Sequence, residues 1–312
     1  MNRLSQVQFW KDSAAKGYLR LVGLFVGLAL FAREAYVSLL ALNVSQISWN
    51  FLLLPIGICT FFYLIQMLSW ALIMECLRTP VGINETIKWY TLSFLPRYIP
   101  GGVWGYWSRG QWLKHVLGTS YTISTLGSII EACAFVITAI AMGLCIFSER
   151  WGKAVLVIIF SGLALCWLIL GAIIDIILGR RLPAMFTQHP RRFSHLEFLL
   201  KWMALLGTYI TFWTLYGITV ALIAQTTTSL AEVQIAIACA ALAWVAGFIV
   251  VIIPGGLGVR EITLASLLNL TIGLPLLDGR LIAVVFRAIV ILAEMLWLLI
   301  GLLFHSLSKY KV

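Results

Sequence analysis

The chain has 312 residues, of which 62% are hydrophobic and 11% are charged, and its formal net charge is +10. Soluble domains are about 45–50% apolar and about 25% charged, so this composition excludes a soluble globular protein and indicates an integral membrane protein. The basic residues stand in short segments between hydrophobic stretches, without a basic patch interleaved with aromatic residues. This pattern argues against nucleic-acid binding and points to membrane topology.

Hydrophobic stretches of about 20 residues, long enough to cross a bilayer, recur along the chain. In chain order we expect spans at 18–42, 49–77, 119–147, 151–178, 198–225 and 280–306. Two further apolar segments, 84–117 and 232–272, are each interrupted near the centre. The predicted fold class is therefore all-α, a polytopic membrane protein with six to eight transmembrane helices.

Both interrupted segments contain the tetrad Ile-Pro-Gly-Gly, at 99–102 and again at 253–256, and an arginine follows each copy, at Arg109 and Arg260. Proline lacks the backbone N–H and glycine is unfavourable inside a helix, so each tetrad predicts an unwound joint between two helical arms. Inside a bilayer such a joint is tolerated only where it is buried in protein or lines a wet cavity.

The two broken segments differ in their arms. The first, 84–117, has short amphipathic arms and is predicted to be a re-entrant hairpin. The second has a longer entering arm, 232–252, which either crosses the membrane fully or is also re-entrant, and the sequence leaves both open. Broken segments in corresponding positions of two halves are typical of transporter binding sites.

The lysines and arginines of the loops predict the orientation. Most of them fall on the side that holds both termini, which we therefore expect to be cytoplasmic, in the cytoplasmic membrane. Residues 18–147 and 151–306 then form two half-repeats with the same order of elements and opposite direction, an inverted repeat. Residues 1–17 are expected to be a cytoplasmic interfacial segment, and 307–312 a cytoplasmic tail.

Charged residues inside a membrane are costly and are normally paired or line a cavity. The helical arm after each glycine pair presents free N–H groups and a positive dipole end, which together with an arginine suit a phosphate. We predict that an anionic headgroup is bound by Arg97, Gly101, Gly102, Arg109, Gly255, Gly256, Arg260 and Arg287. The predicted charge partners or proton carriers are Glu131, Glu261 and Glu294. Internal pairing of these arginines and glutamates without a ligand is a compatible alternative.

Aromatic residues cluster around the first tetrad, at Trp89, Tyr90, Tyr98, Trp104, Tyr106, Trp107 and Trp112. Rings with a polar edge favour the headgroup level, so an interfacial belt is expected. The alternative is an aromatic surface for a glycan or an acyl chain. The six cysteines include no C-x-x-C pair, and no histidine has an i, i+4 partner, so neither a metal nor another cofactor is predicted.

These motifs resemble the membrane domain of the lysylphosphatidylglycerol synthase/flippase-like family. The resemblance spans roughly residues 15–306 and is carried by 97–109, Glu131, 253–261, Arg287 and Glu294. It implies a polytopic domain with re-entrant elements that translocates lipid, which in bifunctional members is aminoacylated phosphatidylglycerol. No aminoacyltransferase domain follows Val312, so synthesis of a modified lipid is not expected.

Taken together, residues and resemblance predict translocation of an anionic phospholipid or a polyprenyl-phosphate-linked lipid across the cytoplasmic membrane, without enzymatic activity. No G-x-x-x-x-G-K-[ST] loop is present, so transport is expected to be passive or coupled to an ion gradient. The alternative is a non-transporting membrane partner of an envelope glycosyltransferase or lipid-modifying machine. An enzyme acting on lipid-linked sugars is disfavoured, because no paired acidic motif is present.

Overall fold

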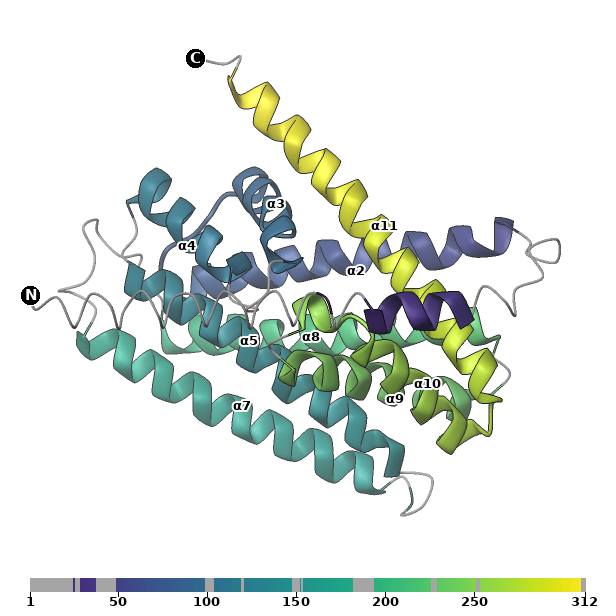
Figure 1. Ribbon diagram of the computed structural model, residues 1–312. Coiled ribbons are helices and arrows are strands. Elements are labelled where there is room, and N and C mark those ends of the chain that lie inside the picture. The colour runs from purple at the N-terminus through teal and green to yellow at the C-terminus, as the bar shows by residue number, and fades with distance from the viewer. Residues whose placement is uncertain are drawn as a thin grey trace, which may run out of the picture.

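The computed structural model describes residues 25, 29–37, 49–98, 104–118, 121–147, 152, 154–181, 194–225, 229–250 and 253–309. Throughout these residues the protein is helical and contains no strand (Figure 1). The long helices are α2 (Trp49–Cys76), α5 (Tyr121–Leu144), α7 (Ala154–Arg181), α8 (His195–Ala224), α9 (Leu230–Ile249) and α11 (Leu276–Lys309). The short helices are α3 (Ile83–Leu92), α4 (Trp104–Leu117) and α10 (Val259–Ile272), with 3-10 turns η2 (Leu95–Tyr98), η3 (Cys145–Phe147) and η5 (Pro254–Gly256). A further helix covers 29–37.

Six helices of the described chain have the length and apolar composition needed to cross a membrane. These candidate spans are Leu52–Cys76, Tyr121–Leu144, Ala154–Ile176, His195–Ala224, Leu230–Ile249 and Leu276–Phe304. The all-α, multi-pass class predicted from the sequence is thereby confirmed. The predicted segment 1–17 and most of the predicted span 18–42 lie outside the described residues.

The broken segments have unequal arms in the structure. The entering arm of the second segment is α9, whose 20 residues are long enough to cross. Its returning arm α10 has 14 residues, or about 21 Å of helix, against a hydrocarbon core of about 30 Å. The arms of the first segment, α3 with 10 residues and α4 with 14, are also too short to cross. How deeply these arms enter the membrane stays a prediction.

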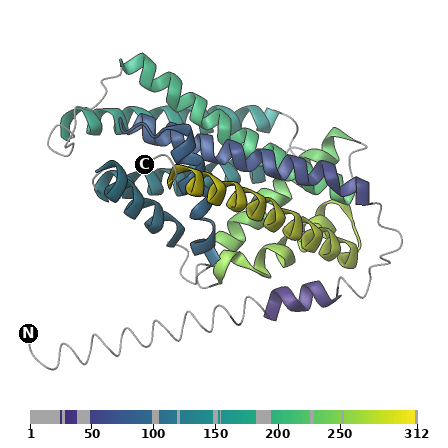
Figure 2. The ribbon, with the colours of Figure 1, turned by 90° about the horizontal axis from the view of Figure 1, so that it is seen from above.

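Helix α8 lies at the centre of the bundle, where it packs against α2, α5, α7, α9 and α11. Its inner face carries the buried rings of Trp202, Tyr209 and Trp213. Helix α7 lies at the edge of the bundle in both views (Figures 1 and 2). Only 17% of its spanning window is buried, against 44% to 56% in the other candidate spans, so most of α7 is left uncovered by the described residues.

Helices α8 and α9 come unusually close at Gly217. A Cβ atom added there would lie 2.2 Å from the backbone Cα of Ile237, so the contact depends on the missing side chain. Gly207, on the same helix, has no atom within 4 Å of such a Cβ. The two glycines therefore form a matched pair for measuring what the close approach contributes.

We expect Gly217→Ala to lower the free energy of unfolding by about 1–3 kcal/mol, because overpacking forces the two helices apart. Gly207→Ala should leave it unchanged or raise it by up to about 1 kcal/mol through helix propensity. Thermal unfolding of the detergent-solubilised protein measures both. Equal effects of the two substitutions would contradict close packing of α8 on α9.

Candidate functional site

The second tetrad forms an unwound joint, as the sequence predicts. After α9 the chain turns through η5, and Gly255, Gly256 and Gly258 adopt φ of 62°, 66° and 80°. Residues with a Cβ rarely adopt this left-handed region, so the glycines are required by the backbone here. Helix α10 then begins at Val259.

The two broken segments meet, because η2 of the first is in contact with η5 of the second. Residues 99–103 lie outside the described part of the chain, and with them Gly101 and Gly102. Arg97 is in η2, but its side chain is not described. The second joint is also covered by helix 29–37, since a Cβ on Gly258 would lie 2.3 Å from the Cβ of Leu30.

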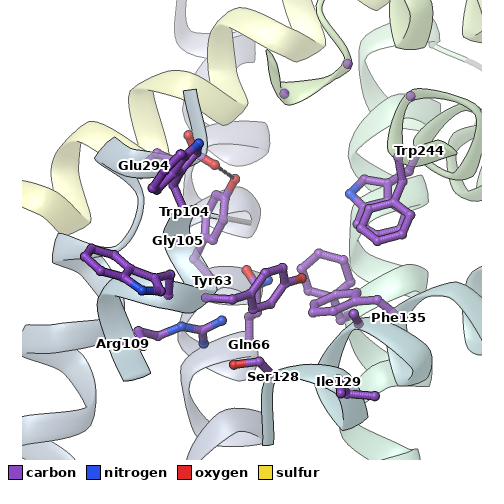
Figure 3. Close-up of a pocket in the computed structure, with 18 of the residues that line it drawn as sticks. Tyr63, Gln66, Trp104, Gly105, Arg109, Ser128, Ile129, Phe135, Trp244 and Glu294 are labelled. Atoms are coloured by element: carbon purple, nitrogen blue, oxygen red, sulfur yellow. Dashed lines mark hydrogen bonds between the residues drawn. The ribbon is translucent and has the colours of Figure 1, made fainter. Parts of the chain in front are cut away.

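A cavity of about 790 Å³ lies between the two broken segments. This volume falls within the roughly 300–1,000 Å³ of small-molecule sites. Among the predicted site residues, its walls include Arg109, Gly255, Gly256, Arg260, Arg287 and Glu294. Figure 3 shows Arg109 of α4 and Glu294 of α11 on the same side of the cavity, across from Trp244 of α9. The structure thus brings together side chains that are far apart in the sequence.

The mouth of the cavity lies between α4 and α5. Of the side chains that line the cavity, the exposed ones are Trp107 of α4 and Tyr121, Thr125 and Ile129 of α5. The three on α5 are four residues apart and so form one stripe along a helix that can span the membrane. Since α5 is a candidate membrane span, these exposed side chains lie on a face of the bundle that can border lipid.

Arg109 is held by a buried ion pair with Glu131 of α5. The guanidinium makes two hydrogen bonds to the carboxylate, Nη1 to Oε1 at 3.2 Å and Nη2 to Oε2, and the side chains are 2% and 1% exposed. The Tyr90 hydroxyl donates to the same carboxylate at 2.5 Å, and the guanidinium lies 4.4 Å from the Tyr90 ring centre. This arrangement fixes α4 against α3 and α5.

Arg287 of α11 stabilises the second joint. Its Nε lies 3.6 Å from Oε1 of Glu261, and its Nη2 donates to the carbonyl oxygen of Gly255 at 3.4 Å. About two helical turns further along α11, Glu294 accepts a hydrogen bond of 2.6 Å from the Tyr63 hydroxyl (Figure 3). The internal pairing considered from the sequence is therefore present at Arg109 and Arg287.

Arg260 differs from the other two arginines, because it forms no hydrogen bond or ion pair with any residue that the structure describes. Its Nε is buried, and its guanidinium lies 5.3 Å from the ring centre of Trp244. Gly247 makes room for the side chain, since a Cβ there would lie 2.3 Å from Cγ of Arg260. Gly247 was not among the site residues predicted from the sequence, although a glycine inside an apolar helix is itself a signal of close approach.

We call Arg109, Arg260, Arg287, Glu131, Glu261 and Glu294 the charge cluster. Its three arginines all line the cavity, whereas Glu131 and Glu261 lie behind them and do not. The carboxylate that does reach the cavity wall is Glu294. The cavity wall is therefore positive, with compensating negative charge one layer deeper.

The interfacial belt predicted around the first tetrad is wrong for two of its members. Tyr90 is 0% exposed and Trp112 is 4% exposed, because both pack in the core beside Trp70. Trp104, Tyr106 and Trp107 line the cavity instead. The alternative interpretation, an aromatic surface for a glycan or an acyl chain, stays a prediction.

Within the described residues, no three His, Cys, Asp or Glu side chains lie close enough together to hold a metal ion. In a comparison with protein families, the model described as Lysylphosphatidylglycerol synthase TM region matches residues 18–297. The matched range includes both tetrads and the whole charge cluster. No curated protein and no solved structure gives a significant match.

The arginines of the cavity should differ in their effect on stability. We expect Arg109→Met to lower the free energy of unfolding by about 3–5 kcal/mol, because it leaves the buried Glu131 carboxylate without its cation. Adding Glu131→Gln should restore part of the loss. Arg260→Met should cost less than about 1 kcal/mol, because no carboxylate is bonded to it. Thermal unfolding in detergent measures all three, and equal losses for the two arginine variants would contradict the assignment of partners.

Proposed function

Because the chain belongs to the lysylphosphatidylglycerol synthase TM region family, we propose that it translocates a lipid with an anionic headgroup across the cytoplasmic membrane. The observation that carries the proposal is Arg260, a guanidinium without a carboxylate partner in the described chain, in the wall of a cavity between two chain breaks. Arg260 is half-buried and its Nε is fully buried, and a cation inside a membrane domain is costly unless it is paired. An anionic ligand supplies the missing partner.

The chemistry of the wall suits a phosphate. Arginine binds phosphate through two parallel N–H groups, which gives both strength and orientation. Helix α10 begins at Val259, one residue before Arg260, so its positive N-terminal end adds to the attraction for an anion. Arg109 and Arg287 contribute further positive charge from the same wall.

The lateral mouth favours a lipid over a soluble anion. A lipid can enter between α4 and α5 with its headgroup in the cavity and its acyl chains still in the bilayer. From Tyr121 to Ile129 the mouth covers about 12 Å of a helix that is about 36 Å long, so it opens to one leaflet only. With the orientation predicted from Lys and Arg, this leaflet is the cytoplasmic one, from which we propose that the lipid is loaded.

We expect purified protein in liposomes to exchange fluorescent phosphatidylglycerol between leaflets, scored by chemical quenching of the outer-leaflet label. Arg260→Gln should slow the exchange about 10- to 100-fold, since a hydrogen bond to a charged group contributes about 1.5–3 kcal/mol. Arg33→Gln is the control and should exchange at the wild-type rate, because its side chain is 64% exposed and does not line the cavity.

Two outcomes would contradict the proposal in different ways. Exchange that Arg260→Gln leaves unchanged would keep translocation but remove the proposed site. Absence of exchange for every anionic lipid tested would favour the alternative function, a non-transporting membrane partner of a glycosyltransferase or lipid-modifying machine.

A further inference from the structure

The cavity contains a polar group that a phosphate cannot satisfy. Gln66 of α2 lines the cavity and is 7% exposed, and its Oε1 atom is buried with no hydrogen-bond partner among the described residues. A buried carbonyl oxygen of this kind needs a donor, and leaving it unpaired is costly. An ionised phosphodiester only accepts hydrogen bonds, so a ligand that satisfies this oxygen needs a donor in another part of its structure.

Neutral hydroxyl groups lie beside Gln66 on the α5 wall. Ser124, Thr125 and Ser128 all line the cavity (Ser128 in Figure 3). The Ser128 hydroxyl donates to the backbone oxygen of Ser124 at 3.0 Å, which leaves its own oxygen able to accept. A group of hydroxyls and one amide can both donate to and accept from the hydroxyls of a ligand.

Aromatic rings of α4 also line the cavity. Trp104 and Trp107 of α4 contact each other at 6.1 Å between ring centres, and both line the cavity. Trp107 is 58% exposed at the mouth, with Tyr121 near it in the α5 stripe. Apolar ring faces next to a few neutral polar groups are typical of small-molecule sites that fix the orientation of a ligand.

The charges of the wall disfavour a cationic headgroup. Arg109 and Arg287 are paired with glutamates, but an ammonium group in the cavity would also face Arg260, which has no carboxylate partner among the described residues. Like charges in a site of low polarity repel strongly. An aminoacylated lipid is therefore a poor fit to this chain.

We infer that the translocated lipid carries a neutral, hydroxyl-rich group on its phosphate, a sugar or a polyol, and that Gln66 selects for it. This inference rests on the proposed function and adds the chemical class of the headgroup to it. The phosphate binds at Arg260, and a hydroxyl of the neutral group donates to Gln66 Oε1 while the aromatic wall of α4 covers its carbon face.

The test compares lipids that share acyl chains and differ only beyond the phosphate. Fluorescent phosphatidylinositol, phosphatidylglycerol, phosphatidic acid and lysylphosphatidylglycerol are each reconstituted with the protein, and leaflet exchange is measured. We expect the inositol and glycerol lipids to exchange about tenfold faster than the bare phosphate lipid, and the lysyl lipid to exchange slowest. Gln66→Leu should reduce the two fast rates to that of phosphatidic acid and leave the rate of phosphatidic acid unchanged.

Selectivity can also be measured without translocation. Glycerol 3-phosphate should raise the unfolding temperature of the detergent-solubilised wild type more than inorganic phosphate does at equal concentration. In Gln66→Leu the two compounds should act equally. This measurement needs only binding. If the wild type prefers glycerol 3-phosphate but exchanges no lipid, the proposed function is wrong and the inference about the bound headgroup is still supported.

Three results would overturn the inference. The first is equal exchange of phosphatidic acid and phosphatidylinositol by the wild type. The second is exchange of lysylphosphatidylglycerol as fast as that of phosphatidylglycerol. The third is a Gln66→Leu variant that keeps its preference between glycerol 3-phosphate and inorganic phosphate. In the first two cases the proposed translocation of an anionic lipid would still stand.

Discussion

A backbone that leaves the helix within a bilayer must find its hydrogen bonds inside the protein, and this constraint organises the molecule. At the second joint, Arg287 donates to the carbonyl oxygen of Gly255, while helix 29–37 packs on Gly258 and η2 lies against η5. Each neighbour covers part of the unwound segment. The cavity lies against this joint, since Gly255 and Gly256 form part of its wall.

Similar residues of the charge cluster differ in how they are paired within the protein. Arg109 is bonded to Glu131 and ties α4 to α5, so much of its charge is used within the fold. Arg260 occupies a comparable place after the second tetrad but is accompanied by Trp244 and by the gap that Gly247 leaves. The two arginines that follow the tetrads therefore both line the cavity, but only Arg109 is bonded to a carboxylate among the described residues.

The sequence predicted much of the fold but less of the site. Hydrophobic length located the spans, and Pro-Gly-Gly located the joint at 253–256, because both signals are local. Ion pairs such as that between Arg109 and Glu131 depend on how separate helices pack, which no spacing reveals. The belt assigned to Tyr90 and Trp112 failed for the same reason, since composition does not say which way a ring faces. Gln66 was missed because one amide in an apolar helix forms no pattern.

The formal charges of the cluster, three positive and three negative, sum to zero. In the proposed translocation these side chains stay in place in the protein, so only the charge of the headgroup moves through the electric field of the membrane. A potential of 100 mV, negative inside, favours outward movement of one negative charge by about 2.3 kcal/mol. Electrical energy alone can thus bias the distribution of such a lipid toward the outer leaflet, without nucleotide hydrolysis.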